Sequence, residues 1–371
     1  MRIVITGGLG FIGLALCRRL LEAGHAVRLV DSLSPQIHGA LPDVLAPEGA
    51  EVLRADVRRL GDHPEALADC DAVYHLAAET GTAQSMYRIE EYTDVNATGT
   101  AALLQALARA PRRPRKVVLA SSRSVYGEGA YAAEGTGTIV QPGTRSKAQL
   151  EAGQWEPRGP RGEMLRPVPT PETLPFAPSS VYAATKAAQE LLLLSAAEAL
   201  GIEPVVFRFQ NVYGEGQSLM NPYTGIISIF FNRARQGLEI PLYEDGLESR
   251  DFVHVADIVD ALVAALQADV PPGLPMNLGS GEPTSVRMLA NELLAASGFK
   301  ASVRVSGQYR VGDIRHCYAD LGRARDVLGY KPRVSLAQGL ARFCAWAAQQ
   351  PAYQDRLDAA AEELRRKGLG T

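Results

Sequence analysis

A glycine-spaced turn near the start of the chain limits its possible folds more than any other feature. Residues 6–13, TGGLGFIG, follow the aliphatic run RIVIT and open a stretch in which apolar residues recur at helical spacing. Gly7, Gly10 and Gly13 allow a sharp strand-to-helix turn, and the free N–H groups of the helix start could then face a phosphate. The simpler alternative is a tight turn that binds nothing.

The rest of the first half repeats this alternation of strand and helix. Aliphatic runs such as AVRLVD, AVYHLAA, KVVLASS and EPVVFRF alternate with helical patterns at about 11–23, 92–110 and 181–200. Alternating strands and helices predict an α/β fold with a Rossmann-type, doubly wound parallel sheet. We expect this domain to span residues 1–212, and a smaller, mixed α/β substrate-binding domain to span 213–371, partly interleaved with the first.

Two segments depart from this pattern. Residues of about 128–178 are rich in Gly, Pro, Glu and Arg, which predicts an insertion that is either functional or peripheral. The final segment, RLDAAAEELRRKG, predicts a solvated helix.

Asp31 indicates which ligand the glycine turn could bind. It ends the second expected strand, 31 − 13 = 18 positions after the last glycine of the turn. A carboxylate at this place accepts hydrogen bonds from the ribose hydroxyls of NAD and repels the 2′-phosphate of NADP. The spacing therefore predicts a dinucleotide site with NAD as the cofactor.

Composition excludes several other classes of protein. The net charge of the 371 residues is −3, so a nucleic-acid partner is not expected. No run of 18 apolar residues occurs, so we expect no membrane span. The four cysteines are scattered without a C-x-x-C pair, as is typical of reduced thiols in a cytoplasmic protein.

Three short motifs carry a family resemblance. Asp31-Ser32-Leu33, Ala55-Asp56-Val57 and residues 75–78, HLAA, resemble the extended short-chain dehydrogenase/reductase family. For Asp56 the alternative is a helix N-cap. The resemblance, together with the glycine turn, implies that the NAD-binding residues are Gly7, Gly10, Phe11, Ile12, Gly13, Asp31, Ser32, Asp56, Val57, Leu76, Ala77, Ala78, Asn96, Tyr182 and Lys186.

Tyr182 and Lys186 form the expected catalytic pair. They are four residues apart in VYAATK, so both side chains lie on one face of the expected helix. A phenol with a pKa of about 10 is a poor base, and a neighbouring ammonium would lower that pKa. A Y-x-x-x-K pair alone could equally be surface decoration. The family resemblance adds Ser122 as the hydroxyl that contacts the reacting sugar oxygen.

The segment around Ser122 also excludes one reaction. Related dehydratases carry Thr-Asp-Glu-Val-Tyr-Gly here, where the Asp-Glu pair eliminates water. This chain has Ser122-Arg123-Ser124-Val125-Tyr126-Gly127, without the two carboxylates. We therefore do not expect 4,6-dehydration, and Ser124 could instead be an ordinary turn residue.

The second half contains segments that resemble the family's nucleotide-sugar site. FRFQNVYG, SRDFVHVAD and YRVGDIRH imply contacts from Asn211, from the diphosphate-binding Arg250 and Arg310, and from Asp313 to the ribose. Each arginine alone could be a surface salt bridge. GTAQSMY and NPYTG resemble the branch of nucleotide-sugar 4-epimerases that acts on dTDP-6-deoxy sugars. The full set of implied substrate-binding residues is Gln84, Ser85, Met86, Ser122, Arg123, Ser124, Asn211, Asn221, Tyr223, Thr224, Arg250, Arg310 and Asp313.

Together these features predict an NAD-dependent 4-epimerase that works through a transient 4-keto sugar on a dTDP- or UDP-linked hexose. The alternatives are a nucleotide-sugar 4-ketoreductase or dehydrogenase with the same three catalytic residues, and a non-catalytic NAD-sensing protein. Relatives carry Cys-x-x-Cys in the insertion where this chain has GPRG at 159–162, so we expect no metal.

The resemblance also implies a homodimer formed by the helices at about 92–110 and 181–200. The apolar residues on these helices could instead serve only the core of the monomer. They are Leu103, Leu104, Leu107, Leu191 and Leu194.

Overall fold

The computed structural model describes residues 1–39, 46–221 and 225–371. Within these residues the largest element is a parallel sheet of seven strands, ordered β13-β9-β5-β4-β1-β2-β3. This confirms the predicted Rossmann-type, doubly wound sheet. Its strands are β1 (Arg2–Thr6), β2 (Ala26–Asp31), β3 (Glu51–Arg54), β4 (Ala72–His75), β5 (Lys116–Ser122), β9 (Glu203–Phe209) and β13 (Met276–Leu278).

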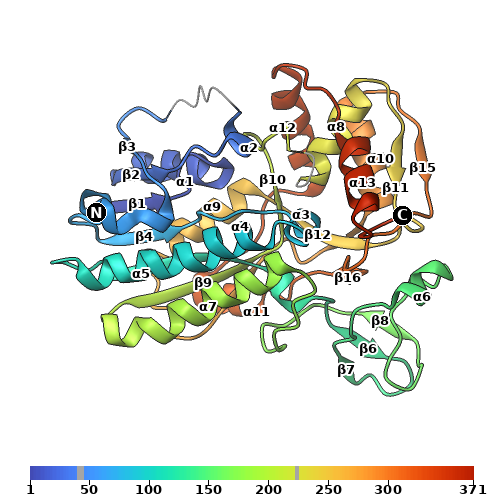
Figure 1. Cartoon of the computed structure of the whole chain (residues 1–371), viewed down its shortest axis with the longest axis horizontal. Helices are drawn as coiled ribbons and strands as arrows, with labels where there is room; N and C mark the ends of the chain where they lie inside the picture. Colours follow the sequence, from blue (N-terminus) through green and yellow to red (C-terminus); the bar gives the residue numbers. More distant parts are fainter. Residues whose placement is uncertain (40–45, 222–224) are drawn as a thin grey trace.

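Helices cover both faces of this sheet, as Figure 1 shows. Alternate side chains of β1 enter different cores: Ile3 and Ile5 pack on one face, and Val4 packs on the other. Because both faces are buried, the central strands are almost wholly aliphatic. The helices that pack around the sheet are α1 (Phe11–Glu22), α5 (Gly99–Arg109), α7 (Val181–Leu200) and α9 (Val255–Ala264).

The helix expected at about 92–110 is interrupted near its start. Here α4 (Ile89–Thr93) leads into a π-helical turn (Asp94–Thr98), which continues into α5. The wider turn holds one extra residue per turn, and this local change left no signature in the apolar spacing.

The chain beyond residue 212 contributes to both halves of the molecule. Strand β13 and helices α9 and α11 (Gly322–Leu328) pack on the large sheet, whereas several other elements build a second core around Phe231 and Phe343. This second core includes α8 (Ile226–Arg235), α10 (Val286–Ser297), α12 (Leu336–Ala348) and the pair β11 (Ile240–Leu242) and β15 (Val303–Val305). A small mixed sheet adjoins it, made of β10 (Asn211–Tyr213), β12 (Ser249–His254), β14 (Pro283–Ser285) and β16 (His316–Cys317).

The insertion forms a small lobe of its own. Its strands β6 (Tyr131–Ala133), β7 (Ile139–Val140) and β8 (Leu165–Pro167) pair antiparallel, and α6 (Lys147–Glu151) lies beyond them. Figure 1 shows this lobe projecting from the rest of the molecule, with β16 on the side facing it. Backbone bonds attach it to the β16 segment: Gly129 N–H donates to the carbonyl of His316 at 3.0 Å, and Thr170 N–H to that of Tyr318 at 2.8 Å.

The end of the chain differs from the expectation of a solvated helix. The helix exists as α13 (Leu357–Arg366), but its apolar face is buried through Leu357, Ala360 and Leu364. Gly370 then forms an antiparallel bridge with Arg310. The expectation was therefore wrong for one face, because the apolar spacing within a charged segment was overlooked.

The five leucines expected at a dimer interface have two different environments. Leu103, Leu104 and Leu107 are buried in the core of this chain, while Leu191 is 55% exposed and Leu194 is partly buried. Only the last two are available to a second subunit. In the part of the chain that the structure describes, every helix is too short or too polar to cross a bilayer.

The remaining helices are short. They are α2 (Pro35–His38) and α3 (Thr82–Ser85), together with 3₁₀ turns at Val57–Asp62, Pro64–Leu67 and Arg123–Tyr126.

Candidate active site

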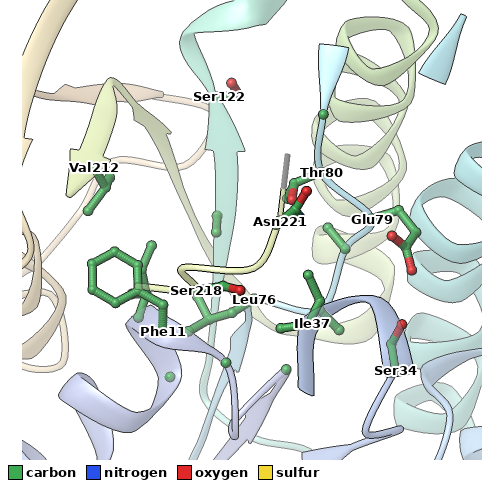
Figure 2. Close-up of a pocket in the computed structure, with 18 of the residues that line it drawn as sticks. Phe11, Ser34, Ile37, Leu76, Glu79, Thr80, Ser122, Val212, Ser218 and Asn221 are labelled. Carbon is green, nitrogen blue, oxygen red and sulfur yellow. The ribbon is translucent and has the colours of Figure 1, made fainter. Parts of the chain in front are cut away.

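A cavity of about 860 Å³ opens at the carboxyl ends of β1, β2, β4 and β5, where a doubly wound sheet binds its ligands. Figure 2 shows side chains from several segments around it: Phe11 and Leu76 from the sheet half, Ser122 at the end of β5, and Ser218 and Asn221 from the second half. The predicted site residues on its wall are Gly7, Gly10, Phe11, Ile12, Gly13, Asp31, Ser32, Asp56, Val57, Leu76, Ala77, Ala78, Ser122, Arg123, Ser124, Tyr182, Lys186, Asn211 and Asn221.

The glycine turn leaves no room for side chains. Gly7 has a φ of +68°, and a Cβ there would lie 2.7 Å from the backbone nitrogen of Ala77. A Cβ on Gly13 would lie 2.6 Å from the carbonyl oxygen of Gly7. The backbone of the turn therefore packs directly against the residues that follow β4, with no room for a side chain. The absence of side chains here also lets a pyrophosphate come close to the backbone of the turn.

Asp31 faces this turn as a carboxylate. Its two oxygens accept hydrogen bonds from the N–H groups of Leu9, at 3.0 Å, and Leu33, at 2.9 Å. His38 Nε2 lies 3.6 Å from the same group. Burial alone would raise the pKa of Asp31, but these interactions together lower it, so the group stays charged. A fixed anion on the cavity wall suits the ribose hydroxyls of NAD.

For Asp56 both expectations apply. Its carboxylate caps the 3₁₀ turn that starts at Val57, accepting from the N–H of Arg58 at 2.9 Å, and it also borders the cavity.

The three expected catalytic residues meet at one point of the cavity. Ser122 ends β5, and its Oγ accepts from Ser124 N–H at 3.1 Å. Tyr182 and Lys186 lie on the first turns of α7, which Ser180 caps. Lys186 Nζ donates to the carbonyl of Ala120 at 2.8 Å and lies 6.0 Å from the ring centroid of Tyr182.

The electrostatics of this group correct one expectation. Burial raises the pKa of Tyr182 above its ordinary value, and the opposing influences are a hydrogen bond with Ser122 and the charge of Arg123. Burial also lowers the pKa of Lys186 to about 7, although the carboxylate of Glu190 works against this. In the protein alone, the positive charge of Arg123 lowers the pKa of Tyr182, while burial makes Lys186 less readily charged.

Beneath this group lies a buried ion pair that the sequence analysis missed. Glu190 accepts from Arg208 at 2.9 Å and from the hydroxyl of Ser121. Glu190 is four residues after Lys186, so the same helical spacing that paired Tyr182 with Lys186 could have indicated it.

The segment expected to face the hexose supports the catalytic helix instead. Ser85 Oγ accepts from the backbone N–H of Tyr182 at 3.0 Å, and Gln84 pairs with Gln36 at 2.9 Å and with the hydroxyl of Tyr92 at 2.9 Å. Neither residue borders the cavity, and neither does Met86. The wall at this place is made by residues 79–82, just before them.

Asn96 is likewise a supporting residue in this structure. It is fully buried in the π-helical turn, where its amide binds both the N–H of Glu79, at 2.8 Å, and the carbonyl of Glu79, at 3.1 Å. It also donates to Thr185 Oγ1 at 3.0 Å. Asn96 therefore connects the cavity wall at Glu79 to the helix that carries Tyr182.

The charged residues assigned to the nucleotide lie together beside the cavity. Arg250 is buried, approaches Asp313 Oδ1 at 3.4 Å and donates to the carbonyl of Ile314 at 2.7 Å. Arg310 stacks on the ring of Tyr243, 4.4 Å from its centroid. These three charged residues are not on the cavity wall itself, but Arg123 on the wall is close enough to Arg250 that the two charges interact. Tyr223 and Thr224 lie outside the described residues.

Comparison with known proteins identifies the family. The model of the NAD-dependent epimerase/dehydratase family matches residues 3–148 and 159–279. The chain belongs to this family. Its predicted cofactor, NAD, is thereby confirmed, as is the resemblance to extended short-chain dehydrogenases/reductases.

Individual relatives of this family member are similar over nearly its whole length. The dTDP-L-rhamnose 4-epimerase of Burkholderia thailandensis is 42% identical over 353 residues, which cover 94% of this chain and 95% of the relative. The dTDP-glucose 4,6-dehydratase of Streptomyces antibioticus is 30% identical, covering 93% and 92%. Among solved structures, the UDP-glucose 4-epimerase of Thermus thermophilus in complex with NAD has a TM-score of 0.75 at 27% identity, covering 95% of this chain and 100% of that one.

The chain is similar to both epimerases and dehydratases, so overall similarity does not decide between the two reactions. The residues of the site must decide between them. Family membership accounts for the glycine turn, Asp31 and the group of Ser122, Tyr182 and Lys186. Arg123 and Ser124 border the cavity beside this group, and neither carries a carboxyl group. Ser122 and Tyr182 place two hydroxyl groups on the same wall, which is the kind of arrangement that a proton transfer to or from a bound ligand needs.

Proposed function

We propose that this chain is an NAD-dependent nucleotide-sugar 4-epimerase that interconverts dTDP-L-rhamnose and dTDP-6-deoxy-L-talose. The observation that carries the proposal is the convergence of Ser122, Tyr182 and Lys186 on the same cavity as the glycine turn and Asp31. The 42% identity to a dTDP-L-rhamnose 4-epimerase supports the choice of sugar and base.

Tyr182 and Ser122 move the proton in this reaction. Tyr182 Oη takes the proton of the C4 hydroxyl, relayed by Ser122, as a hydride leaves C4. NAD held by the glycine turn and Asp31 would supply the acceptor for this hydride and, in its reduced form, the donor to the opposite face of the 4-keto sugar. Tyr182 then gives its proton back to the C4 oxygen, so the reaction is balanced without any other reagent.

Turning the keto sugar over requires that the nucleotide stays bound. Arg250 and Arg310 would hold the diphosphate, because guanidinium groups donate paired, charge-assisted hydrogen bonds to such oxygens. Asp313 would accept from the ribose of the nucleoside. With the anchor away from C4, the hexose can rotate between the two hydride transfers.

The test uses purified protein, dTDP-L-rhamnose and NMR of the C4 proton. Wild-type protein should produce the C4 epimer without added NADH, and Tyr182→Phe should lose about 10³-fold in kcat while retaining NAD, since a positioned acid–base group contributes roughly 10²–10⁴-fold. Tyr353→Phe, in the second core, is the matched control and should keep full activity.

Two outcomes would contradict the proposal. Consumption of NADH with a 4-keto sugar, and no interconversion of alcohols, would indicate a 4-ketoreductase. Binding of NAD without turnover of any dTDP- or UDP-sugar would indicate an NAD-sensing protein.

We also propose that the enzyme is a homodimer through the exposed side of α7. Leu191 is 55% exposed and half-buried Leu194 is one turn away. Sedimentation of the wild type and of Leu191→Glu would test this, since a charge at the centre of an apolar contact should shift the protein toward the monomer.

A further inference from the structure

A buried arginine of the insertion contacts the loop that we assign to the nucleotide. Arg145 lies between β7 and α6, and its side chain is only 1% exposed. It donates to Glu244 Oε2 at 2.8 Å, to the carbonyl of Trp155 at 3.0 Å and to the carbonyl of Asp313 at 3.0 Å. One guanidinium thus links the lobe to the loop that carries Asp313.

Glu244 is shared between the insertion and this loop. The same oxygen that accepts from Arg145 also accepts from Arg315 Nη1 at 3.0 Å. Glu244 has a φ of +50°, which is an unfavourable backbone conformation for a residue other than glycine. Surrounding contacts that keep a residue in such a conformation mark a tightly determined site.

A second residue at the start of the insertion holds the next part of the loop. Glu128 accepts from the backbone N–H of Arg315 at 2.8 Å and lies 3.7 Å from Arg145 Nε. The carbonyls of Ile314 and Arg315, in turn, are the groups that accept from Arg250. Residues 313–315 are therefore bound from the insertion on one side and by Arg250 on the other.

We propose that the insertion is a part of the nucleotide-sugar site, with Arg145 as the residue that positions Asp313 and Arg250 for a nucleoside diphosphate. This rests on the proposed function, which assigns those two residues to the nucleotide. The arrangement has a plain physical basis. A planar guanidinium can bind a carboxylate and two carbonyls at once in fixed directions. It can therefore fix both the position and the orientation of the loop that carries Asp313.

The test measures binding of a nucleoside diphosphate, which does not depend on turnover. Calorimetric titration of the NAD-bound protein with dTDP alone should show the affinity of Arg145→Met reduced on the order of tenfold, the usual cost of losing an orienting partner behind a ligand-binding group. NAD content should be unchanged, because the glycine turn and Asp31 lie at the ends of β1 and β2, outside the insertion. Arg161→Met is the matched control: it lies in the same lobe, is exposed, and should bind dTDP as the wild type does.

Arg145→Lys is a second, more conservative variant, to be used if Arg145→Met fails to fold. It keeps a positive charge beside Glu244 and Glu128, but one ammonium cannot span the three acceptors, so we expect dTDP binding a few-fold weaker than that of the wild type. In turnover, both variants should raise KM for the sugar nucleotide much more than they lower kcat. A general loss of stability would not separate the two constants in this way.

The outcomes separate this inference from the proposed function. If a folded Arg145 variant binds dTDP as tightly as the wild type, the insertion is peripheral and the inference is wrong. If the wild type binds neither dTDP nor UDP, the assignment of Arg250 and Asp313 to a nucleotide fails, and both proposals fall together.

Discussion

The cofactor end of the cavity and the charged region beside it, which we propose as the nucleotide end, are held in shape by different interactions. At the cofactor end, the shape comes from backbone: Gly7 and Gly13 admit no Cβ, and Lys186 is held by a carbonyl oxygen and has a lowered pKa. At the nucleotide end, the shape comes from ion pairs, and the acidic partners of Arg315 raise its pKa.

The difference lies in how far short sequence motifs define each end. The cofactor end is assembled from such motifs, at residues 7–13, 75–78 and 182–186, which the ends of the parallel strands and α7 bring to one cavity. The buried Arg315 at the nucleotide end binds Asp245 at 2.7 Å and Glu244 at 3.0 Å, some 70 positions earlier, and Glu156 at 2.7 Å, 159 positions earlier. We infer that the shape of the cofactor end depends on positions that have no room for a side chain. The shape of the nucleotide end depends instead on buried charges that neutralise one another.

The largest effect should come from removing the central cation of the nucleotide end. Arg315→Met leaves several carboxylates without their buried partner, so we expect it to lower the free energy of unfolding by about 3–5 kcal/mol. Arg304→Met removes an ion pair that is exposed, 2.6 Å from Glu239, and should cost about 1 kcal/mol or less. Urea unfolding of both variants measures this. Equal losses would mean that burial adds nothing to the ion pairs of the nucleotide end, and that they do not define its shape.

A smaller but specific loss should follow a single methyl group at the cofactor end. Gly7→Ala combines a left-handed backbone, costing about 1–2 kcal/mol, with a contact of 2.7 Å to the backbone of Ala77. We expect affinity for NAD to fall at least about tenfold. Gly61→Ala, where a Cβ has open space and φ is not positive, is the control and should leave NAD binding unchanged. If Gly7→Ala binds NAD normally, shape is not what defines this end.

The smallest effect concerns the two buried cations, Lys186 and Arg315. The pKa of Lys186 is lowered, whereas that of Arg315 is raised. Because the pKa of Lys186 is about 7 in the folded protein, its burial penalty is fully present below pH 7. Above that pH the folded protein holds a neutral lysine while the unfolded chain still binds a proton, so wild-type stability rises toward the ordinary lysine pKa.

Lys186→Met does not titrate at this position and should therefore show its largest stability advantage at low pH. The difference from the wild type should shrink by roughly 2 kcal/mol between about pH 6.5 and 9, measured by unfolding of protein freed of NAD. Lys331→Met, at an exposed lysine, should show no such trend. A pH-independent difference for Lys186→Met would mean that the folded protein keeps the ammonium charged.

Much of the fold and of the cofactor end could be predicted because their determinants are local. The strand-turn-helix pattern at residues 2–22, Asp31 at the next strand end, and the spacing of Tyr182 and Lys186 each act within a few turns of chain. The observed strands and α7 agree with these patterns almost residue for residue.

The nucleotide end was predictable only in part. Arg250 and Asp313 could be assigned by resemblance, but Arg145 lies in an irregular segment, and its partners are 99 and 168 positions away. No periodicity encodes such a pairing. Gln84 and Ser85 follow directly on the wall residues 79–82, but the direction of their side chains depends on contacts with Tyr92 and Tyr182 that form only in the folded chain.

The π-helical turn at Asp94–Thr98 sets a limit on how this sequence can vary in length. The wider turn accommodates one extra residue, so deleting one residue here would give a regular α-helix without the bulge that carries Asn96. Asn96 would then leave the space between Glu79 and Thr185. A gap in this one turn should be far less tolerated than a substitution, whereas the helix that follows it could keep its own apolar face intact.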